Sequence, residues 1–112
     1  MVDDQAPFRT VARTLVGLIS GWRVVGEAAS GEEGVELALR ERPDLVLMDV
    51  HLPGINGIEA ARRITARDEA AVVVLVSTYA DEDLPSGASS CGAAGYVRKD
   101  RLSPQVLREF AG

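Results

Sequence analysis

Cysteine is nearly absent from this chain: Cys91 is the only one among its 112 residues. A single cysteine cannot form an internal disulfide or a cysteine-based zinc site, which excludes a disulfide-stapled scaffold and a zinc finger. A chain of this length can bury a hydrophobic core without such staples. The cysteine usage therefore fits a reducing, cytoplasmic setting, in which Cys91 serves as a small packing residue.

Aromatic residues and basic charge are also in short supply. The chain has one Trp, two Tyr and two Phe, and its net charge is −5 at pH 7. Nucleic-acid binding needs a basic surface and often stacking aromatics, so we expect none from this domain. No apolar run approaches the roughly 18 residues that span a bilayer, and no signal segment is present, so we expect no membrane partner.

Apolar residues follow two spacings along the chain. Spacing of three and four residues predicts helices over residues 7–20, after Ser30, after Asn56 and after Ser103. Short runs of apolar and β-branched residues predict strands over residues 22–29, 45–49, 71–76 and 95–97. Strands that alternate with helices form a parallel sheet covered on both faces, so we predict a doubly wound α/β domain over residues 1–112.

The first strand of that sheet is truncated. Only Met1 and Val2 precede the acidic pair Asp3–Asp4. We expect this pair to lose its anchor, which would weaken a site that needs preorganised ligands. Either the chain begins late, or another chain or tag supplies the strand edge; an exposed edge would also favour a homodimer.

The fourth helix is the second irregularity. The segment from Asp81 to Gly92 stands where a helix is expected, but it contains Pro85 and a run of weak helix formers. We predict a helix that is short, irregular or mobile.

Polar residues stand at the carboxyl ends of the predicted strands. Asp3 and Asp4 follow the first strand, and Asp49 ends the buried apolar strand over residues 45–49. Ser77 follows the strand over residues 71–76, and Lys99 follows the last strand, over residues 95–97. Because these ends share one edge of a parallel sheet, the side chains should converge. Crowded carboxylates need positive charge, which Lys99 and a hard divalent cation, Mg²⁺ above all, would supply. Such a site can accept a phosphoryl group on a carboxylate.

The same residues carry a family resemblance. The runs Val2–Gln5, Leu47–Val50, Val76–Ser77 and Gly95–Asp100, in this order, closely resemble bacterial response-regulator receiver domains, most of all the NarL type. The resemblance spans nearly the whole chain and implies a flavodoxin-like fold of five βα units. Receivers of this type often precede a helix-turn-helix output domain that regulates transcription, and these 112 residues contain no such domain.

The resemblance implies an acceptor and a metal site. Asp49 would receive a phosphoryl group from the phosphohistidine of a sensor histidine kinase. Asp4 would bind Mg²⁺ directly, Asp3 mainly through water, and the backbone carbonyl of His51 would complete the protein ligands. We expect no metal role for the His51 side chain, because one histidine lacks the partners that a transition-metal site needs.

The resemblance also implies a switch. Ser77 and Lys99 would contact the phosphoryl oxygens, and Tyr96 would turn inward as the Ser77 hydroxyl moves toward the phosphate. This is a population shift between two packings, biased by a new charged group at the face of Tyr96 and the last helix. The chemistry would be confined to phosphorylation and dephosphorylation of Asp49, so we do not expect an enzyme.

Two other functions stay open. An unphosphorylated pseudo-receiver would act only as an interaction domain, an interpretation that the truncated first strand keeps alive. A phosphatase of the haloacid-dehalogenase type also uses an aspartate nucleophile at a strand end. That chemistry needs a second aspartate two residues later as the general acid, and His51 stands there.

Overall fold

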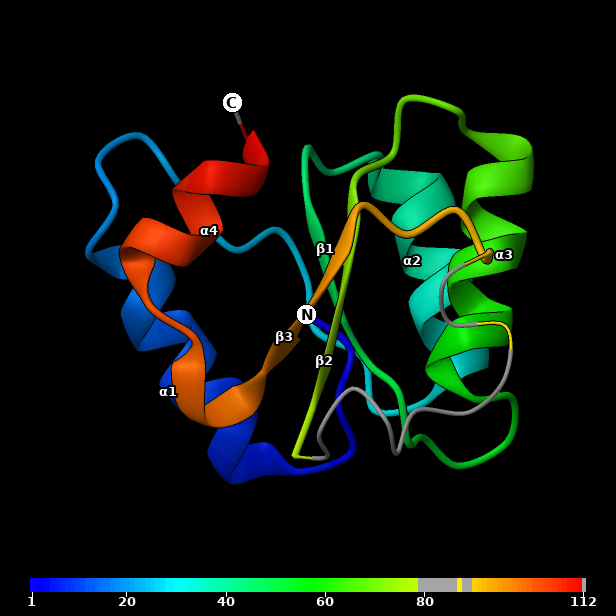
Figure 1. The fold of residues 1–112 in the computed structure, drawn as a ribbon, viewed down its shortest axis with the longest axis horizontal. Coiled ribbons are helices and arrows are strands. Elements are labelled where there is room, and N and C mark those ends of the chain that lie inside the picture. The colour runs from blue at the N-terminus through cyan, green and yellow to red at the C-terminus, as the bar shows by residue number, and fades with distance from the viewer. Residues whose placement is uncertain (79–86, 88–89, 112) are drawn as a thin grey trace.

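Parallel strands with helices on both faces form the domain. A computed structural model describes residues 1–78, 87 and 90–111. Within these residues, the sheet has three named strands in the order β1 (Val46–Asp49), β2 (Val73–Ser77) and β3 (Gly95–Arg98). Figure 1 shows two helices on either side of it: α1 (Ala6–Gly17) and α4 (Pro104–Ala111), and α2 (Gly31–Glu41) and α3 (Gly57–Arg67). The predicted doubly wound α/β class is confirmed.

Three helices begin where the sequence places a capping side chain. Ser30, Asn56 and Ser103 accept hydrogen bonds from the backbone N–H three residues further on, at 3.2, 2.9 and 3.2 Å. These caps satisfy amides that the helix itself leaves unpaired. The predicted starts are therefore confirmed, whereas α1 ends at Gly17 rather than at residue 20.

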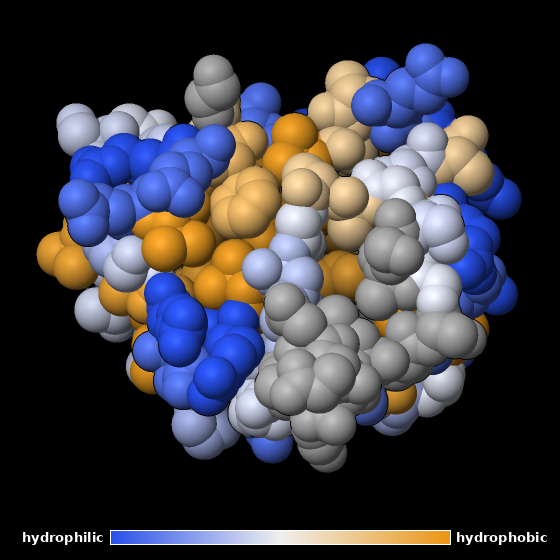
Figure 2. Space-filling view, in the orientation of Figure 1, coloured by the Kyte–Doolittle hydropathy of each residue, from blue (hydrophilic) through white to orange (hydrophobic). Residues whose placement is uncertain are grey.

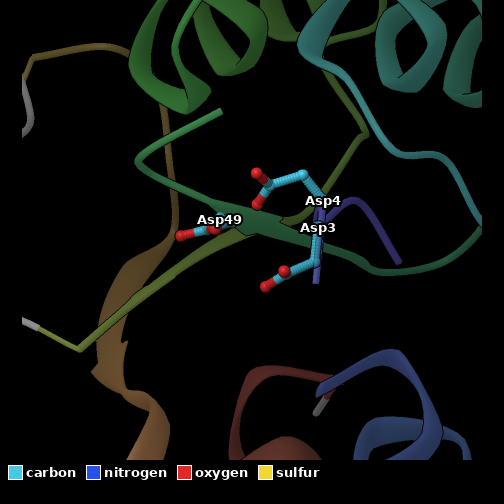
Figure 3. Close-up of side chains that lie close together, drawn as sticks. All are labelled: Asp3, Asp4 and Asp49. Atoms are coloured by element: carbon cyan, nitrogen blue, oxygen red, sulfur yellow. The ribbon is translucent and has the colours of Figure 1, made fainter. Parts of the chain in front are cut away.

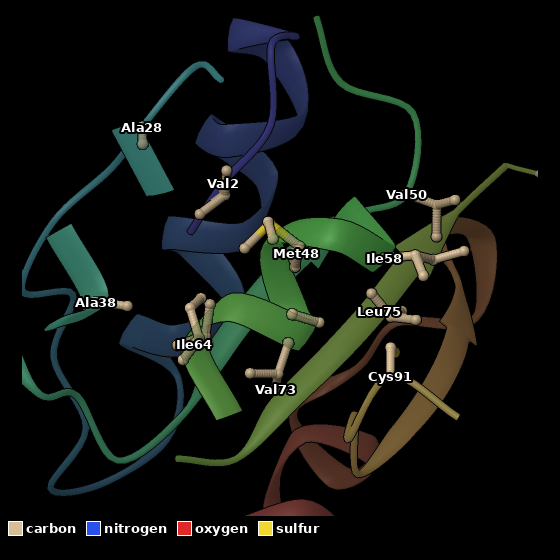
Figure 4. Packing of buried hydrophobic residues seen from close by; sticks show 13 residues of the cluster. Val2, Ala28, Ala38, Met48, Val50, Ile58, Ile64, Val73, Leu75 and Cys91 are labelled. Atoms are coloured by element: carbon tan, nitrogen blue, oxygen red, sulfur yellow. The ribbon is translucent and has the colours of Figure 1, made fainter. Parts of the chain in front are cut away.

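The central strands are buried on both faces, which explains their unbroken apolar sequences. Along β1 the side chains alternate: Met48 packs into a cluster with α2 and α3, and Leu47 into a cluster with α1 and α4. Figure 4 shows the first cluster, in which Cys91 is 2% exposed, as expected of a packing residue. Figure 2 shows that hydrophilic residues gather on the outer side of α3.

The acidic pair is anchored, so the expectation that it would be loose is wrong. Val2 forms single parallel bridges to Ala28 on one side and to Met48 on the other. Its N–H donates to the Leu47 carbonyl at 2.8 Å, and the Asp49 N–H donates to the Val2 carbonyl at 2.9 Å. Even this short first strand therefore fixes the backbone directly before the site.

The predicted strand over residues 22–29 is wrong in extent. Only Ala28 forms a bridge there, because Val2 offers it just one residue of partner. Further back, Trp22 and Val24 face Leu45 and Leu47 across a cavity of about 650 Å³. Because Val2 separates these two segments at only one position, residues 22–24 and 45–47 line this cavity and are not joined there through a hydrogen-bonded strand.

The predicted irregular helix over residues 81–92 falls largely on residues 79–86 and 88–89, outside the part of the chain that the structure describes, and stays a prediction. Among the described helices, none has the length and apolar character needed to cross a membrane.

Candidate functional site

Three carboxylates gather at the carboxyl edge of the sheet. Asp3 and Asp4 follow Val2, and Asp49 ends β1; each offers an oxygen within 4.8 Å of the other two. Figure 3 shows the three side chains grouped beyond the end of β1. Asp3 and Asp49 are buried, at 1% and 5% exposed, while Asp4 is exposed. Strand pairing on both sides of Val2 brings these residues together across nearly fifty positions of sequence.

Lys99 supplies the positive charge in this cluster. It follows β3 directly and opens a 3₁₀ turn (Lys99–Arg101). Its Nζ atom lies 2.6 Å from Asp3 Oδ2 and 3.5 Å from Asp49 Oδ2, and its side chain is only 10% exposed. The structure thus brings the predicted carboxylates and lysine together, and the ammonium lies closer to Asp3 than to Asp49.

The local electrostatics disfavour a charged Asp49. Burial raises the pKa of the Asp49 carboxyl, and the nearby charge of Asp3 raises it further. The Lys99 ammonium and the His51 backbone N–H, which donates to Asp49 Oδ1 at 3.3 Å, oppose these effects only in part. This cluster therefore gains from additional positive charge.

A divalent cation fits the donor set. Carboxylate oxygens are the ligands that Mg²⁺ prefers. Asp3 Oδ2 is buried and forms an ion pair with the Lys99 ammonium at 2.6 Å. A carboxylate has more lone pairs than this one contact uses, so the three grouped carboxylates can still offer oxygens to a hard cation.

The remaining predicted residues have distinct positions. Ser77 is fully buried at the end of β2, one residue beyond Val76, which pairs with Asp49. Tyr96 lies on β3 opposite Leu75, half-buried against the cluster beneath α2 and α3. This position is that of a half-buried core aromatic. The role of Tyr96 as a switch stays a prediction.

Sequence reasoning missed two residues that contact Lys99. The Gln5 side-chain oxygen lies 3.5 Å from Lys99 Nζ, and its backbone N–H donates to Asp3 Oδ1 at 2.7 Å. The ammonium also lies over the Phe8 ring, 4.4 Å from its centroid. The only signal in the sequence was that both residues closely follow the acidic pair, where α1 begins.

Gly57 brings α3 against the site. Its N–H donates to the Val50 carbonyl at 2.8 Å, and a Cβ atom at this position would collide with the Asp49 carbonyl oxygen. Glycine alone permits this approach. The Asp49 backbone is therefore held between Val2 on one side and the start of α3 on the other.

Comparison with known proteins agrees with this arrangement. The family described as "Response regulator receiver domain" matches residues 1–111. The response regulator GacA of Pseudomonas aeruginosa is 36% identical over 100% of this chain and 54% of its own length. The nitrate/nitrite response regulator protein NarL of Escherichia coli is 34% identical over 96% and 50%. The chain spans about half the length of the curated relatives it matches.

Solved structures show the same fold. The signal receiver domain of the putative response regulator NarL from Mycobacterium tuberculosis superposes with a TM-score of 0.90 at 28% identity, covering 98% of this chain and 91% of that one. A LuxR-family response regulator from Aurantimonas sp. SI85-9A1 gives a TM-score of 0.85 at 37% identity, covering 96% and 76%. The chain belongs to the response regulator receiver domain family and is of the NarL type.

Proposed function

We propose that this receiver domain is a phosphoacceptor switch, which takes a phosphoryl group on Asp49 from a sensor histidine kinase in the cytoplasm. The observation that carries the proposal is the grouping of a buried Asp49 with two further carboxylates and the ammonium of Lys99. A carboxylate at a strand end, with positive charge close by, is suited to accept an electron-poor phosphorus.

Receiver domains of this family bind Mg²⁺ at a cluster of aspartates, and Asp3, Asp4 and Asp49 form such a cluster. In our proposal Asp4 binds the ion directly, Asp3 mainly through water, and the His51 carbonyl completes the protein ligands. Mg²⁺ would neutralise the carboxylates and the phosphoryl oxygens during transfer. The grouping of the three carboxylates within 4.8 Å of one another supports this assignment.

The transfer itself requires an ionised Asp49. One Asp49 oxygen attacks the phosphorus atom, and the P–N bond of the donor phosphohistidine breaks. The donor nitrogen keeps the electron pair, and the ring, which is protonated on its other nitrogen in the phosphohistidine, leaves as neutral imidazole. Lys99 holds a phosphoryl oxygen, so charge that develops in transfer meets a donor already in place, and the Ser77 hydroxyl contacts a second phosphoryl oxygen once the group is attached.

The phosphoryl group would act as the switch signal. It adds up to two negative charges at a buried position beside Ser77. The hydroxyl of Ser77 moves toward these oxygens, and Tyr96 takes its inward position, which changes the face of β3 and α4. The half-buried position of Tyr96 on β3, against the cluster beneath α2 and α3, supports this step, because a change in that position would alter the surface of β3.

Intact-mass measurement tests the proposal. We expect incubation with Mg²⁺ and acetyl phosphate to add one labile phosphoryl group, and Asp49→Asn to abolish it. Asp44→Asn is the matched control, because it removes the same charge from an exposed position before β1, away from the site. No adduct under any condition would leave an interaction domain, and rapid turnover of many phosphomonoesters would indicate a phosphatase.

A further inference from the structure

The Lys99 ammonium is held by more than its carboxylate partners. The ring of Phe8 lies beneath it at 4.4 Å, and the Gln5 side-chain oxygen approaches it at 3.5 Å. Both residues belong to the start of α1, where the Gln5 backbone N–H also donates to Asp3 Oδ1 at 2.7 Å. A cation over an aromatic face gains electrostatic energy, and the gain grows when the cation is desolvated, as Lys99 is here.

The contacts of Lys99 with Phe8 and Gln5 are important because its ammonium is shared between two carboxylates. Lys99 Nζ is 2.6 Å from Asp3 Oδ2 and 3.5 Å from Asp49 Oδ2. A divalent cation held by Asp4 and Asp49, and by Asp3 through water, shares these carboxylates with the ammonium. When the cation binds, its positive charge weakens the attraction of the ammonium to both carboxylates, and the ammonium needs another attraction to remain beside Asp49.

The Phe8 ring is well placed to provide that attraction. Its backbone N–H donates to the Gln5 carbonyl at 3.1 Å, within the first turn of α1. The side chain packs against the cluster beneath α1 and α4, which limits its rotation. The next residue, Arg9, donates from its guanidinium to the Asp3 carbonyl, so this helix start is tied to the acidic pair.

We propose that Phe8 is a positioning residue, which with Gln5 holds the Lys99 ammonium at the phosphoryl site while a cation occupies the carboxylates. The proposal deepens the proposed function and rests on it. Neither residue touches the transferred group; each acts through Lys99. In the absence of the ring, the ammonium follows the carboxylates or turns to solvent, and phosphoryl transfer slows.

Phosphorylation kinetics give the first test. With saturating Mg²⁺ and acetyl phosphate, we expect Phe8→Leu to lower the rate constant for Asp49 phosphorylation by about threefold to tenfold. Mg²⁺ affinity should stay unchanged, and Phe8→Tyr, which keeps an aromatic face, should restore the rate. Phe110→Leu is the matched control, because Phe110 packs against the same cluster from α4. In a Lys99→Met background, Phe8→Leu should have no further effect.

A spectroscopic readout separates this proposal from the proposed function. The Phe8 ring current should shift the Lys99 ε-methylene protons upfield, and Phe8→Leu but not Phe110→Leu should remove that shift, with or without phosphorylation. Failure of the wild-type protein to form an adduct on Asp49 would contradict the proposed function while leaving this measurement valid. A Phe8→Leu protein with a wild-type rate, or one with equally weakened Mg²⁺ binding, would overturn the positioning role.

Discussion

At the scale of single residues, Asp49 is costly to the fold in its charged form. The negative charge of Asp3 lies close by, and Lys99 is shared between the two carboxylates. Two carboxylate charges whose oxygens lie within 4.8 Å of each other repel by about 3 kcal/mol at an effective dielectric constant of 20. The Lys99 ammonium offsets part of this repulsion. A buried carboxylate kept under such repulsion gains from nearby positive charge or from a change of its own charge state.

Asp49→Asn should therefore stabilise the metal-free protein at pH 7, by about 1–3 kcal/mol in urea unfolding with EDTA present. The pKa of Asp49 is raised in the folded protein, so its ionisation costs stability in full above that pKa; the cost declines as the pH falls below it and is gone once the carboxyl is protonated in the unfolded chain as well. The advantage of the variant should consequently shrink as the pH falls through the raised pKa. An advantage that grows on acidification would contradict this account.

Lys99→Met should have the opposite effect. Removing the ammonium leaves two buried carboxylates without a charged partner, and breaking such a buried pair typically costs about 3–5 kcal/mol. Added Mg²⁺ should recover much of the loss, because it replaces the missing charge. Arg63→Met provides the control: its ion pair with Glu59 is exposed, and its loss should leave the melting temperature nearly unchanged. Equal losses in both variants would argue against a buried charge cluster.

The residue scale also marks what sequence could and could not predict. The positions of Asp49 and Lys99 were predictable, because each follows or ends a recognisable strand, whereas Asp3 and Asp4 follow only the short run Met1–Val2 and were placed by the order of the polar residues. The contact of Phe8 with Lys99 was not, since it joins the start of one helix to the end of the last strand and depends on where a flexible lysine side chain lies. The order of the strands predicts which backbone segments lie side by side. It does not predict how the side chains at their ends pack against one another.

At the scale of elements, α3 buttresses the site through its first residue. Gly57→Ala should destabilise the protein by at least about 2 kcal/mol, because its Cβ would displace the Asp49 carbonyl. The same shift should weaken Mg²⁺ binding. Gly17→Ala is the matched control: it changes another helical glycine, at the end of α1, where a Cβ would meet no atom within 4 Å. We expect that variant to be neutral or slightly more stable in thermal unfolding.

Elements differ in how far their sequences determine them. The runs in β1 and β2 predicted strands correctly, because burial on both faces selects unbroken apolar sequence. The segment from 22 to 29 also contains β-branched and other apolar residues, yet only Ala28 forms a bridge. A strand exists only beside a partner, and the partner here is a single residue, Val2. The apolar pattern within a segment cannot predict the length of the strand that pairs with it, when that strand is distant in sequence.

At the scale of the whole molecule, negative charge is concentrated at the carboxyl edge of the sheet. The chain carries a net charge of −5, and the carboxyl edge concentrates three of its carboxylates around one lysine. The two helix layers pack on separate clusters on opposite faces of the sheet, so charge at the edge of the sheet bears on both layers. Binding of a cation at the edge is therefore linked to the stability of the entire fold.

Mg²⁺ should raise the unfolding free energy of the whole domain. A ligand that binds only the folded state stabilises it by about 1.4 kcal/mol when its free concentration is ten times its dissociation constant. We expect a concentration-dependent rise in melting temperature that EDTA reverses and that Asp4→Asn or Asp49→Asn greatly reduces. Asp44→Asn changes net charge equally but lies before the start of β1, so it should keep the full response. If all three variants responded alike, Mg²⁺ would be acting as a general counterion, and the carboxylates at the strand ends would not form its site.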